Sequence, residues 1–138
     1  MKFSGALFAI LLSVAATAPL SDAMADACDN AGGGQAGLNE CYGKVFKKAD
    51  AELNKRYKEI ESRLADDADT KKQLITAQRA WVAYRDAECG FRASGGGSVA
   101  PMTYLICQTD LTHSRIQDFR NFLNCEEGDL TCPVPAAN

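Results

Sequence analysis

The sequence predicts an all-α fold, namely an antiparallel bundle of three long helices that is cross-linked by disulfides. Three long segments repeat apolar residues at the spacing of one helix face. No segment alternates apolar and polar residues as a half-buried strand does. The chain has 138 residues, of which 24% are charged and six are cysteines, and this combination fits one small cross-linked domain.

Residues 1–25 are predicted to be a signal peptide. A positive charge at the second position precedes an apolar run over residues 6–16, which is too short to cross a membrane comfortably. Residues 23–25, Ala-Met-Ala, form the small-x-small pattern of a signal peptidase site. An aspartate two positions before Cys28 argues against a lipid-attachment site. We therefore expect one mature domain, residues 26–138, that is periplasmic or secreted and has no stable membrane anchor.

The first predicted helix covers residues 38–64, after an irregular lead-in. Its apolar face has steps of three or four residues: Leu38, Cys41, Val45, Ala49, Leu53, Tyr57, Ile60 and Leu64. Gly43 weakens this helix by about 1 kcal/mol relative to alanine. A bend or a split near Gly43 is therefore an alternative to one straight helix.

The second predicted helix covers residues 70–92, and Asp69 or Thr70 is expected to cap it. It contains Trp81, the one tryptophan, which we expect at the centre of the core because it can bury more apolar area than any other side chain. Leu74, Ala77, Trp81, Tyr84 and Phe91 would share the buried face. A core helix is the favoured interpretation, and a catalytic element is the alternative.

The third predicted helix covers residues 101–123 and follows a flexible connector, Gly95–Gly97. Pro101 suits the first turn of a helix, where its missing N–H is not needed. The apolar face of this helix consists of Met102, Leu105, Ile106, Leu111, Ile116, Phe119 and Leu123. The residues from 124 onward are expected to form a short irregular C-terminal tail.

All six cysteines lie in the predicted mature part of the chain. An even number in a small exported chain indicates disulfides, whereas a zinc site is disfavoured because there is no C-x-x-C pair and only one histidine. Sequence proximity favours the pairs Cys28–Cys41, Cys89–Cys107 and Cys125–Cys132. The middle bridge closes a loop for which chain entropy gives about 3 kcal/mol.

Charge restricts the class of partner. With a net charge of −3 and a pI of about 5.1, the chain is poorly suited to nucleic acid or anionic membranes, and a cationic protein is the better match. No cofactor is expected, because the glycine run at residues 95–97 lacks the Gly-Lys-Ser/Thr ending of a phosphate-binding loop.

Catalytic interpretations find little support in the sequence. His113 has no nucleophile set up beside it by a recognisable motif. The many carboxylates could in principle act as a glycosidase pair, but such a pair needs a cleft and opposed pKa values, and a thin bundle offers little cleft. We therefore expect a binding protein rather than an enzyme.

Polar residues recur on all three helices at helical spacing. Asp50, Asn54 and Tyr57 share one side of the first helix, and the other two helices contribute Gln78, Arg79, Arg85, Thr112 and Arg115. The favoured interpretation is a network that bridges the helices at the edge of the core, since arginine can bond two partners at once. A partner-binding patch is the alternative.

These residues together resemble the LprI-like family, which is named for a bacterial lysozyme inhibitor. The resemblance rests on five pieces: Asp50-x-x-Leu53-Asn54-x-x-Tyr57, Gln78-Arg79-x-Trp81-x-x-x-Arg85-x-x-x-Cys89, Gly97-Ser98, Cys107, and Leu111-Thr112-x-x-Arg115. It implies an exported, helical, disulfide-linked domain that inhibits lysozyme, with these motif residues as structural hallmarks. The alternative is a periplasmic protein-interaction or envelope-stress module with a partner other than lysozyme. A cell-wall enzyme is the third and weakest possibility.

The topology predicts where the acidic residues gather. In an up-down-up bundle the turn between the first two helices and the Cys125–Cys132 segment lie at the same end. Six carboxylates would meet there: Asp66, Asp67, Asp69, Glu126, Glu127 and Asp129. We expect this end to bind a protein partner, for which a basic lysozyme is the example. The uncharged Gly95–Gly97 connector at the opposite end is the competing surface.

Overall fold

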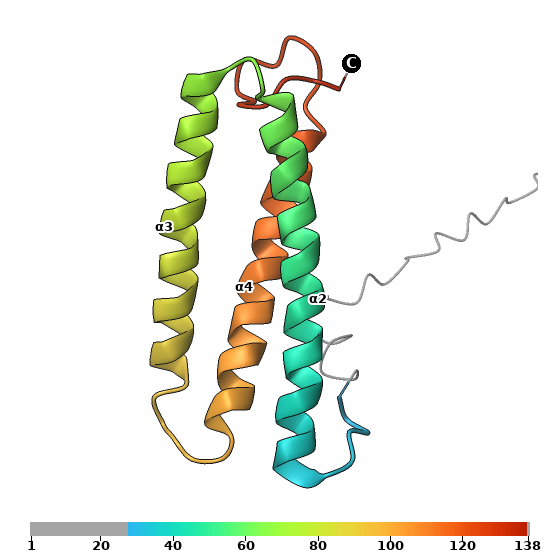
Figure 1. The fold of residues 1–138 in the computed structure, drawn as a ribbon, viewed down its shortest axis with the longest axis vertical. Coiled ribbons are helices and arrows are strands. Elements are labelled where there is room, and N and C mark those ends of the chain that lie inside the picture. Colours follow the sequence, from blue (N-terminus) through green and yellow to red (C-terminus); the bar gives the residue numbers. More distant parts are fainter. Residues whose placement is uncertain (1–27, 138) are drawn as a thin grey trace, which may run out of the picture.

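The computed structural model describes residues 28–137, which form three helices and no strand. The helices are α2 (Gly34–Arg63), α3 (Ala68–Arg92) and α4 (Ala100–Leu123). They run up, down and up, so the predicted antiparallel all-α bundle is confirmed (Figure 1). The predicted signal peptide lies outside the described residues. Within residues 28–137 no helix is long and apolar enough to cross a membrane.

Helix α2 begins four residues before the predicted start. Gly33 has φ 88° and Gly34 has φ 60°, and this left-handed backbone lets the glycine run turn directly into the helix. The helix then continues through Gly43 as one element of 30 residues, so the predicted split is not present. A Cβ at Gly43 would lie 3.9 Å from Leu105, which shows how closely α2 approaches α4 there.

Helix α3 begins with a different cap from the two that the sequence analysis considered. The carboxylate of Asp67 accepts a hydrogen bond of 3.0 Å from the backbone N–H of Thr70, so Asp67 is the N-cap and the helix starts at Ala68. Asp69 lies in the first turn, where its negative charge faces the positive end of the helix dipole.

Helix α4 is the central element of the bundle. It packs most extensively against α2 and less extensively against α3 (Figure 1). The main cluster of buried apolar side chains fills the half of the bundle next to the α2–α3 turn. Its members are Leu53, Ile60, Leu64, Ile116, Phe119, Leu123 and Val134.

The C-terminal tail is irregular, as predicted, but it also completes the core. After the Cys125–Cys132 disulfide the chain turns back, and Val134 is buried in the main cluster. Arg63 at the end of α2 donates hydrogen bonds to the carbonyls of Leu123, at 2.8 Å, and Pro135, at 3.5 Å. One arginine thus ties α2 to both α4 and the tail.

The three disulfides are the pairs that sequence proximity predicted. Cys28–Cys41 fastens the lead-in to α2, with 5.8 Å between the Cα atoms. Cys89–Cys107 fastens α3 to α4 one to two turns from their connecting loop, with 5.5 Å between the Cα atoms. Cys125–Cys132 closes the first part of the tail.

The predicted buried face of α3 is confirmed for Leu74, which packs against the main cluster, but it is wrong for the exposed residues Ala77, Tyr84 and Phe91 and for the central position of Trp81. Trp81 is half-buried and packs against the edge of the main cluster, while the side chains of Tyr84 and Phe91 are 54% and 75% exposed. The buried residues of α3 are Arg85 and Cys89. Because α3 meets α4 through an arginine and a disulfide, the helix is rotated away from the orientation that its large apolar residues predict.

Candidate functional site

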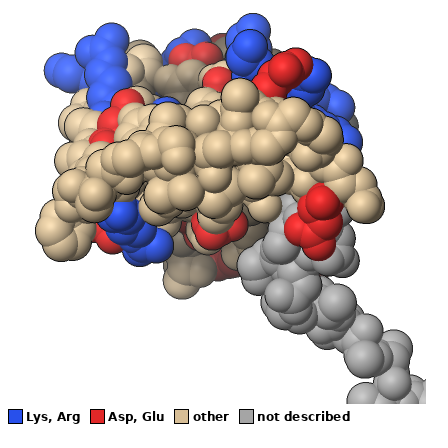
Figure 2. Space-filling model, turned by 90° about the horizontal axis from the view of Figure 1, so that it is seen from below, with Lys and Arg blue, Asp and Glu red and all other residues tan. Residues whose placement is uncertain are grey.

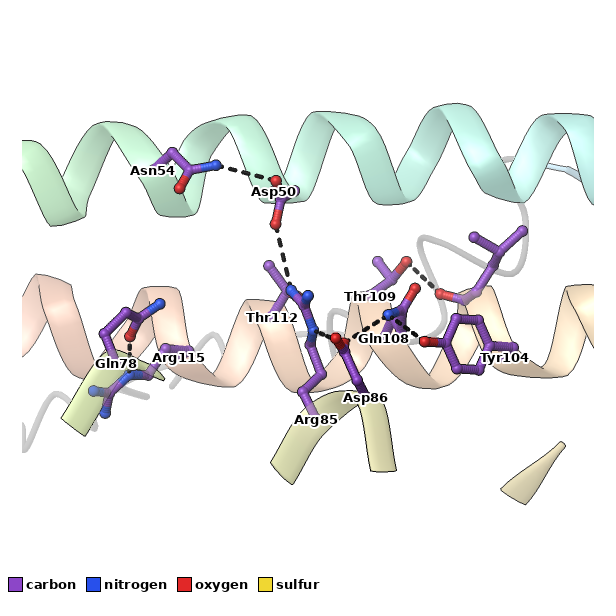
Figure 3. Close-up of polar contacts among 11 residues, drawn as sticks. Asp50, Asn54, Gln78, Arg85, Asp86, Tyr104, Gln108, Thr109, Thr112 and Arg115 are labelled. Carbon is purple, nitrogen blue, oxygen red and sulfur yellow. Dashed lines mark hydrogen bonds and ion pairs between the residues drawn. The ribbon is translucent and has the colours of Figure 1, made fainter. Parts of the chain in front are cut away.

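Arg85 is the centre of a polar network that joins all three helices. Its side chain is only 8% exposed. Nη1 lies 3.3 Å from Asp50 Oδ1 on α2 and 3.3 Å from Thr112 Oγ1 on α4, and Nε lies 3.1 Å from Asp86 Oδ1 on α3 (Figure 3). The guanidinium therefore satisfies three partners on three helices, which a lysine could not do.

Aromatic rings cover the faces of this guanidinium. The carbon at the centre of the Arg85 guanidinium lies 5.3 Å from the ring centroid of Phe46 and 5.2 Å from that of Trp81. Arg115 lies 5.9 Å from the Trp81 ring and 4.7 Å from the Phe119 ring. Trp81 thus lies between two cations at the edge of the core, an arrangement that cation–π attraction stabilises.

Further polar pairs extend the network along the bundle. Gln108 donates to Asp86 at 3.0 Å, Asn54 donates to Asp50 at 3.0 Å, and Arg115 donates to Gln78 at 3.1 Å (Figure 3). Gln108 also lies 3.0 Å from the hydroxyl of Tyr104. Phe46, Tyr104 and Gln108 are not among the residues that the sequence pattern predicted for the network. The spacing of four residues from Tyr104 to Gln108 and from Gln108 to Thr112 is the signal that could have revealed the last two.

The other motif residues lie around this network rather than in it. Leu53 is buried in the core, and the ring of Tyr57 lies 6.2 Å from that of Phe119. Burial raises the pKa of Tyr57, and the neighbouring Glu61 raises it further. Arg79 is exposed and makes no hydrogen bond or ion pair with the described residues, so the prediction that it joins the network is wrong.

The network leaves no polar group available to a ligand in its interior. Among residues 28–137, no buried side-chain nitrogen or oxygen lacks a hydrogen-bond partner, and no group of three or more His, Cys, Asp or Glu could hold a metal ion. A fully satisfied buried network orients the helices that carry it. The geometry therefore favours the bridging network over a binding patch at these residues.

His113 has no catalytic geometry around it. It is half-buried on α4 and makes no hydrogen bond with the described residues. Burial raises the pKa of Asp110, one turn earlier, and the charge of His113 partly lowers it. A general base needs an oriented partner within hydrogen-bond reach of a nucleophile, and the described residues supply none at this position.

The six predicted carboxylates do gather at one end of the bundle. The α2–α3 turn and the Cys125–Cys132 segment lie together at the top of Figure 1, and all six acidic residues are exposed. We call this region the acidic end; it consists of Asp66, Asp67, Asp69, Glu126, Glu127 and Asp129.

Two members of the acidic end also hold the local backbone. Asp67 caps α3 through the N–H of Thr70, and Asp129 accepts hydrogen bonds from the hydroxyl and the N–H of Thr131 at 2.7 and 2.9 Å. These hydrogen bonds hold the pKa of Asp67 and the pKa of Asp129 below their usual range. The other four carboxylates have no side-chain partner among the described residues, so they remain available to a partner.

An apolar hollow opens beside the acidic end, between the three helices and the tail. Its volume is about 240 Å³. The sequence analysis did not find it, because one wall exists only where the tail folds back at Pro133 and Val134. The hollow is lined by Ile60, Leu64, Thr70, Gln73, Leu74, Ala77, Arg115, Phe122, Pro133 and Val134.

The opposite end of the bundle has different chemistry. Figure 2 looks onto that end and shows an extended uncharged surface with charged side chains at its edges. The connector between α3 and α4 carries Gly96 and Gly97 at φ 73° and 77°, and Phe91 and Val99 beside it are exposed. The acidic end therefore gathers six carboxylates, whereas the opposite end has charges of both signs around an uncharged surface.

Comparison with known proteins places these features in a family. Residues 28–119 match the model of the family described as lysozyme inhibitor LprI. The chain is also 36% identical over 107 residues to an uncharacterized protein of Rhizobium meliloti (strain 1021), in a match that covers 67% of this chain and 76% of the relative. No solved structure matches the chain. The range matched by the family model contains the Arg85 network and the α2–α3 turn, and it ends before Cys125.

Proposed function

Because this chain belongs to the lysozyme inhibitor LprI family, we propose that it is an exported protein that binds and inhibits a lysozyme. Its three disulfides suit the oxidising conditions outside the cytoplasm. Among residues 28–137 no buried side-chain polar atom of the network around Arg85 lacks a hydrogen-bond partner, so inhibition would come from surface contact rather than from chemistry on the substrate. The alternative partner is another basic protein of the cell envelope.

The acidic end is the surface that we assign to the partner. The observation that carries this assignment is the set of four carboxylates that have no side-chain partner in the described part of the chain, gathered at one end beside two that are held in place. Lysozymes of the common animal type are strongly basic proteins, and complementary charge steers such a partner towards this end. The opposite end has charges of both signs around an uncharged surface, so it offers a basic partner no comparable attraction.

The test is a variant that removes the four unpartnered charges and spares the backbone contacts. Asp66→Asn, Asp69→Asn, Glu126→Gln and Glu127→Gln together are expected to weaken binding to a basic animal-type lysozyme by at least about fourfold, because each of the four rim charges contributes about 0.2–1 kcal/mol. The salt dependence of binding should become shallower, since added salt can no longer screen the lost charges. Binding is measured by titration calorimetry, and inhibition by a turbidity assay on bacterial cell walls.

The matched control changes the opposite end without changing any charge. Gly96→Ala with Gly97→Ala strains two positive-φ residues, but a Cβ at either position meets no atom within 4 Å. We expect this variant to bind as the unchanged protein does. Normal binding by the four-fold amide variant, together with loss of binding by the glycine variant, would place the partner at the connector instead. Failure to inhibit any class of lysozyme would favour the other envelope partner.

A further inference from the structure

We infer that the hollow beside the acidic end anchors one aromatic side chain of the basic partner, an inference that rests on the proposed function. We call it the anchor pocket, and its apolar walls are Ile60, Leu64, Leu74, Ala77, Phe122 and Val134. The acidic end would then be a combined surface, in which carboxylates attract the partner and the pocket receives its side chain.

The size of the anchor pocket fits a side chain rather than a free ligand. Sites for small molecules in proteins usually have volumes of about 300–1,000 Å³. The anchor pocket, at about 240 Å³, is smaller than that range and opens to the surface. A single ring carried by a partner's backbone would fill it and bury a large apolar area with little loss of conformational freedom.

The lining of the pocket favours an aromatic occupant over a cationic one. Arg115 is the one charged side chain among the lining residues. Its guanidinium lies 4.7 Å from the Phe119 ring and is held by Gln78, at 3.1 Å, and by Asp118, at 3.5 Å. A positive charge fixed in the wall repels a cation inside the pocket, whereas an aromatic ring can stack against a guanidinium.

The charges outside the pocket favour cations beside that ring. Leu64 and Thr70 line the pocket, and the turn between them carries Asp66 and Asp69 on exposed positions. Pro133 follows directly after the Cys125–Cys132 loop, which carries the exposed glutamates at positions 126 and 127. An apolar centre with a charged rim is the usual anatomy of a protein-binding hot spot.

The walls of the pocket are already in place before a partner arrives. The Cys125–Cys132 disulfide limits the motion of the tail, and the hydrogen bonds from Arg63 to the carbonyls of Leu123 and Pro135 hold it against α2. A surface that is ordered before binding loses less entropy when the complex forms. The pocket therefore suits a rigid contact between two folded proteins.

Short peptides test the pocket without relying on any lysozyme. The first probe is an end-blocked peptide with phenylalanine between two pairs of arginines; the second has alanine in place of phenylalanine, and the third has glutamates in place of arginines. We expect the first peptide to shift the methyl NMR signals of Leu64, Leu74 and Val134. The alanine peptide should bind at least about tenfold more weakly, because burial of one apolar side chain is lost, and the glutamate peptide should not bind.

Two leucine substitutions on α3 distinguish the contribution of the pocket to binding from the contribution of the charges. Ala77→Leu places a larger side chain at the wall of the pocket and changes no charge, and leucine is as compatible with a helix as most residues are. We expect it to weaken binding of the first peptide, and of lysozyme, at least about tenfold while the salt dependence stays unchanged. Ala87→Leu is the control, because Ala87 is also exposed but does not line the pocket. This variant should bind as the unchanged protein does.

The outcomes distinguish this inference from the proposed function. If the protein inhibits lysozyme but the first peptide shifts none of the three methyl signals and Ala77→Leu inhibits normally, the anchor pocket is wrong and the proposed function stands. If the peptide binds in the pocket and Ala77→Leu blocks it, but no lysozyme is inhibited, the pocket stands and its natural partner is a different basic protein.

Discussion

Replacing Phe119 with alanine is expected to lower the free energy of unfolding by about 3–5 kcal/mol, the usual cost of truncating a fully buried aromatic side chain. Phe119 is 0% exposed and lies in the main cluster between α2 and α4. Its ring also lies near those of Tyr57 and Phe122 and below the guanidinium of Arg115. A small domain has a total stability of about 5–15 kcal/mol, so this loss would be severe. Urea denaturation followed by circular dichroism measures it.

Two other aromatic residues serve as comparisons for this prediction. Phe91→Ala removes the same side chain from a position that is 75% exposed, and it should change the stability by no more than about 0.5 kcal/mol. Trp81→Ala should have an intermediate cost, because Trp81 is half-buried at the edge of the core. Should Trp81→Ala destabilise the protein more than Phe119→Ala, the centre of the core would lie on α3 after all.

The second large effect is expected from Arg85→Ala, which should cost about 3 kcal/mol. Removing one partner of a buried ion pair usually costs about 3–5 kcal/mol, and the lower end applies here because the side chains of Asp50 and Asp86 are 39% and 46% exposed and stay hydrated. The substitution also removes the contacts with the Phe46 and Trp81 rings. Thermal unfolding at neutral pH provides the measurement.

Two further arginine variants sharpen this prediction. Arg85→Lys keeps the charge but cannot reach Asp50, Thr112 and Asp86 together, so it should recover only a small part of the loss. Arg79→Ala, on the same helix but at an exposed residue that makes no hydrogen bond or ion pair with the described residues, should be within about 0.5 kcal/mol of the unchanged protein. Equal losses at Arg79 and Arg85 would argue against the network as the structural link between the helices.

Much of the fold could be predicted from apolar periodicity and cysteine spacing. Both signals are local, and together they predicted the three helices, their antiparallel arrangement and the three disulfides. The rotation of α3 could not be predicted in this way, because Tyr84 and Phe91 continue the apolar face of Trp81 along the helix but are left exposed by the packing. The position of the helix depends on Arg85 and Cys89, whose partners lie on other helices.

Only part of the candidate site could be predicted, and the reason is similar. The direction of each helix was sufficient to bring the two acidic segments to one end, so the acidic end follows from topology. The anchor pocket depends on where Val134 lies after the chain reverses at the Cys125–Cys132 loop. A reversal in an irregular tail has no periodic signal in the sequence, and its apolar contact becomes visible only in three dimensions.

Because the main apolar cluster fills one half of the bundle, the two halves should differ in how readily they open locally. The half next to the acidic end is held by the main apolar cluster, whereas the buried residues near the other end are the aromatic Tyr42 together with cysteines and small or polar residues, among them Cys28, Cys107 and Thr109. Segments with few buried apolar contacts open more readily than the packed core does. Amide hydrogen exchange should therefore be slowest over residues 53–64 and 116–123 and become faster towards the glycine connector. A partner at the acidic end would thus meet the half of the molecule that contains the main apolar cluster.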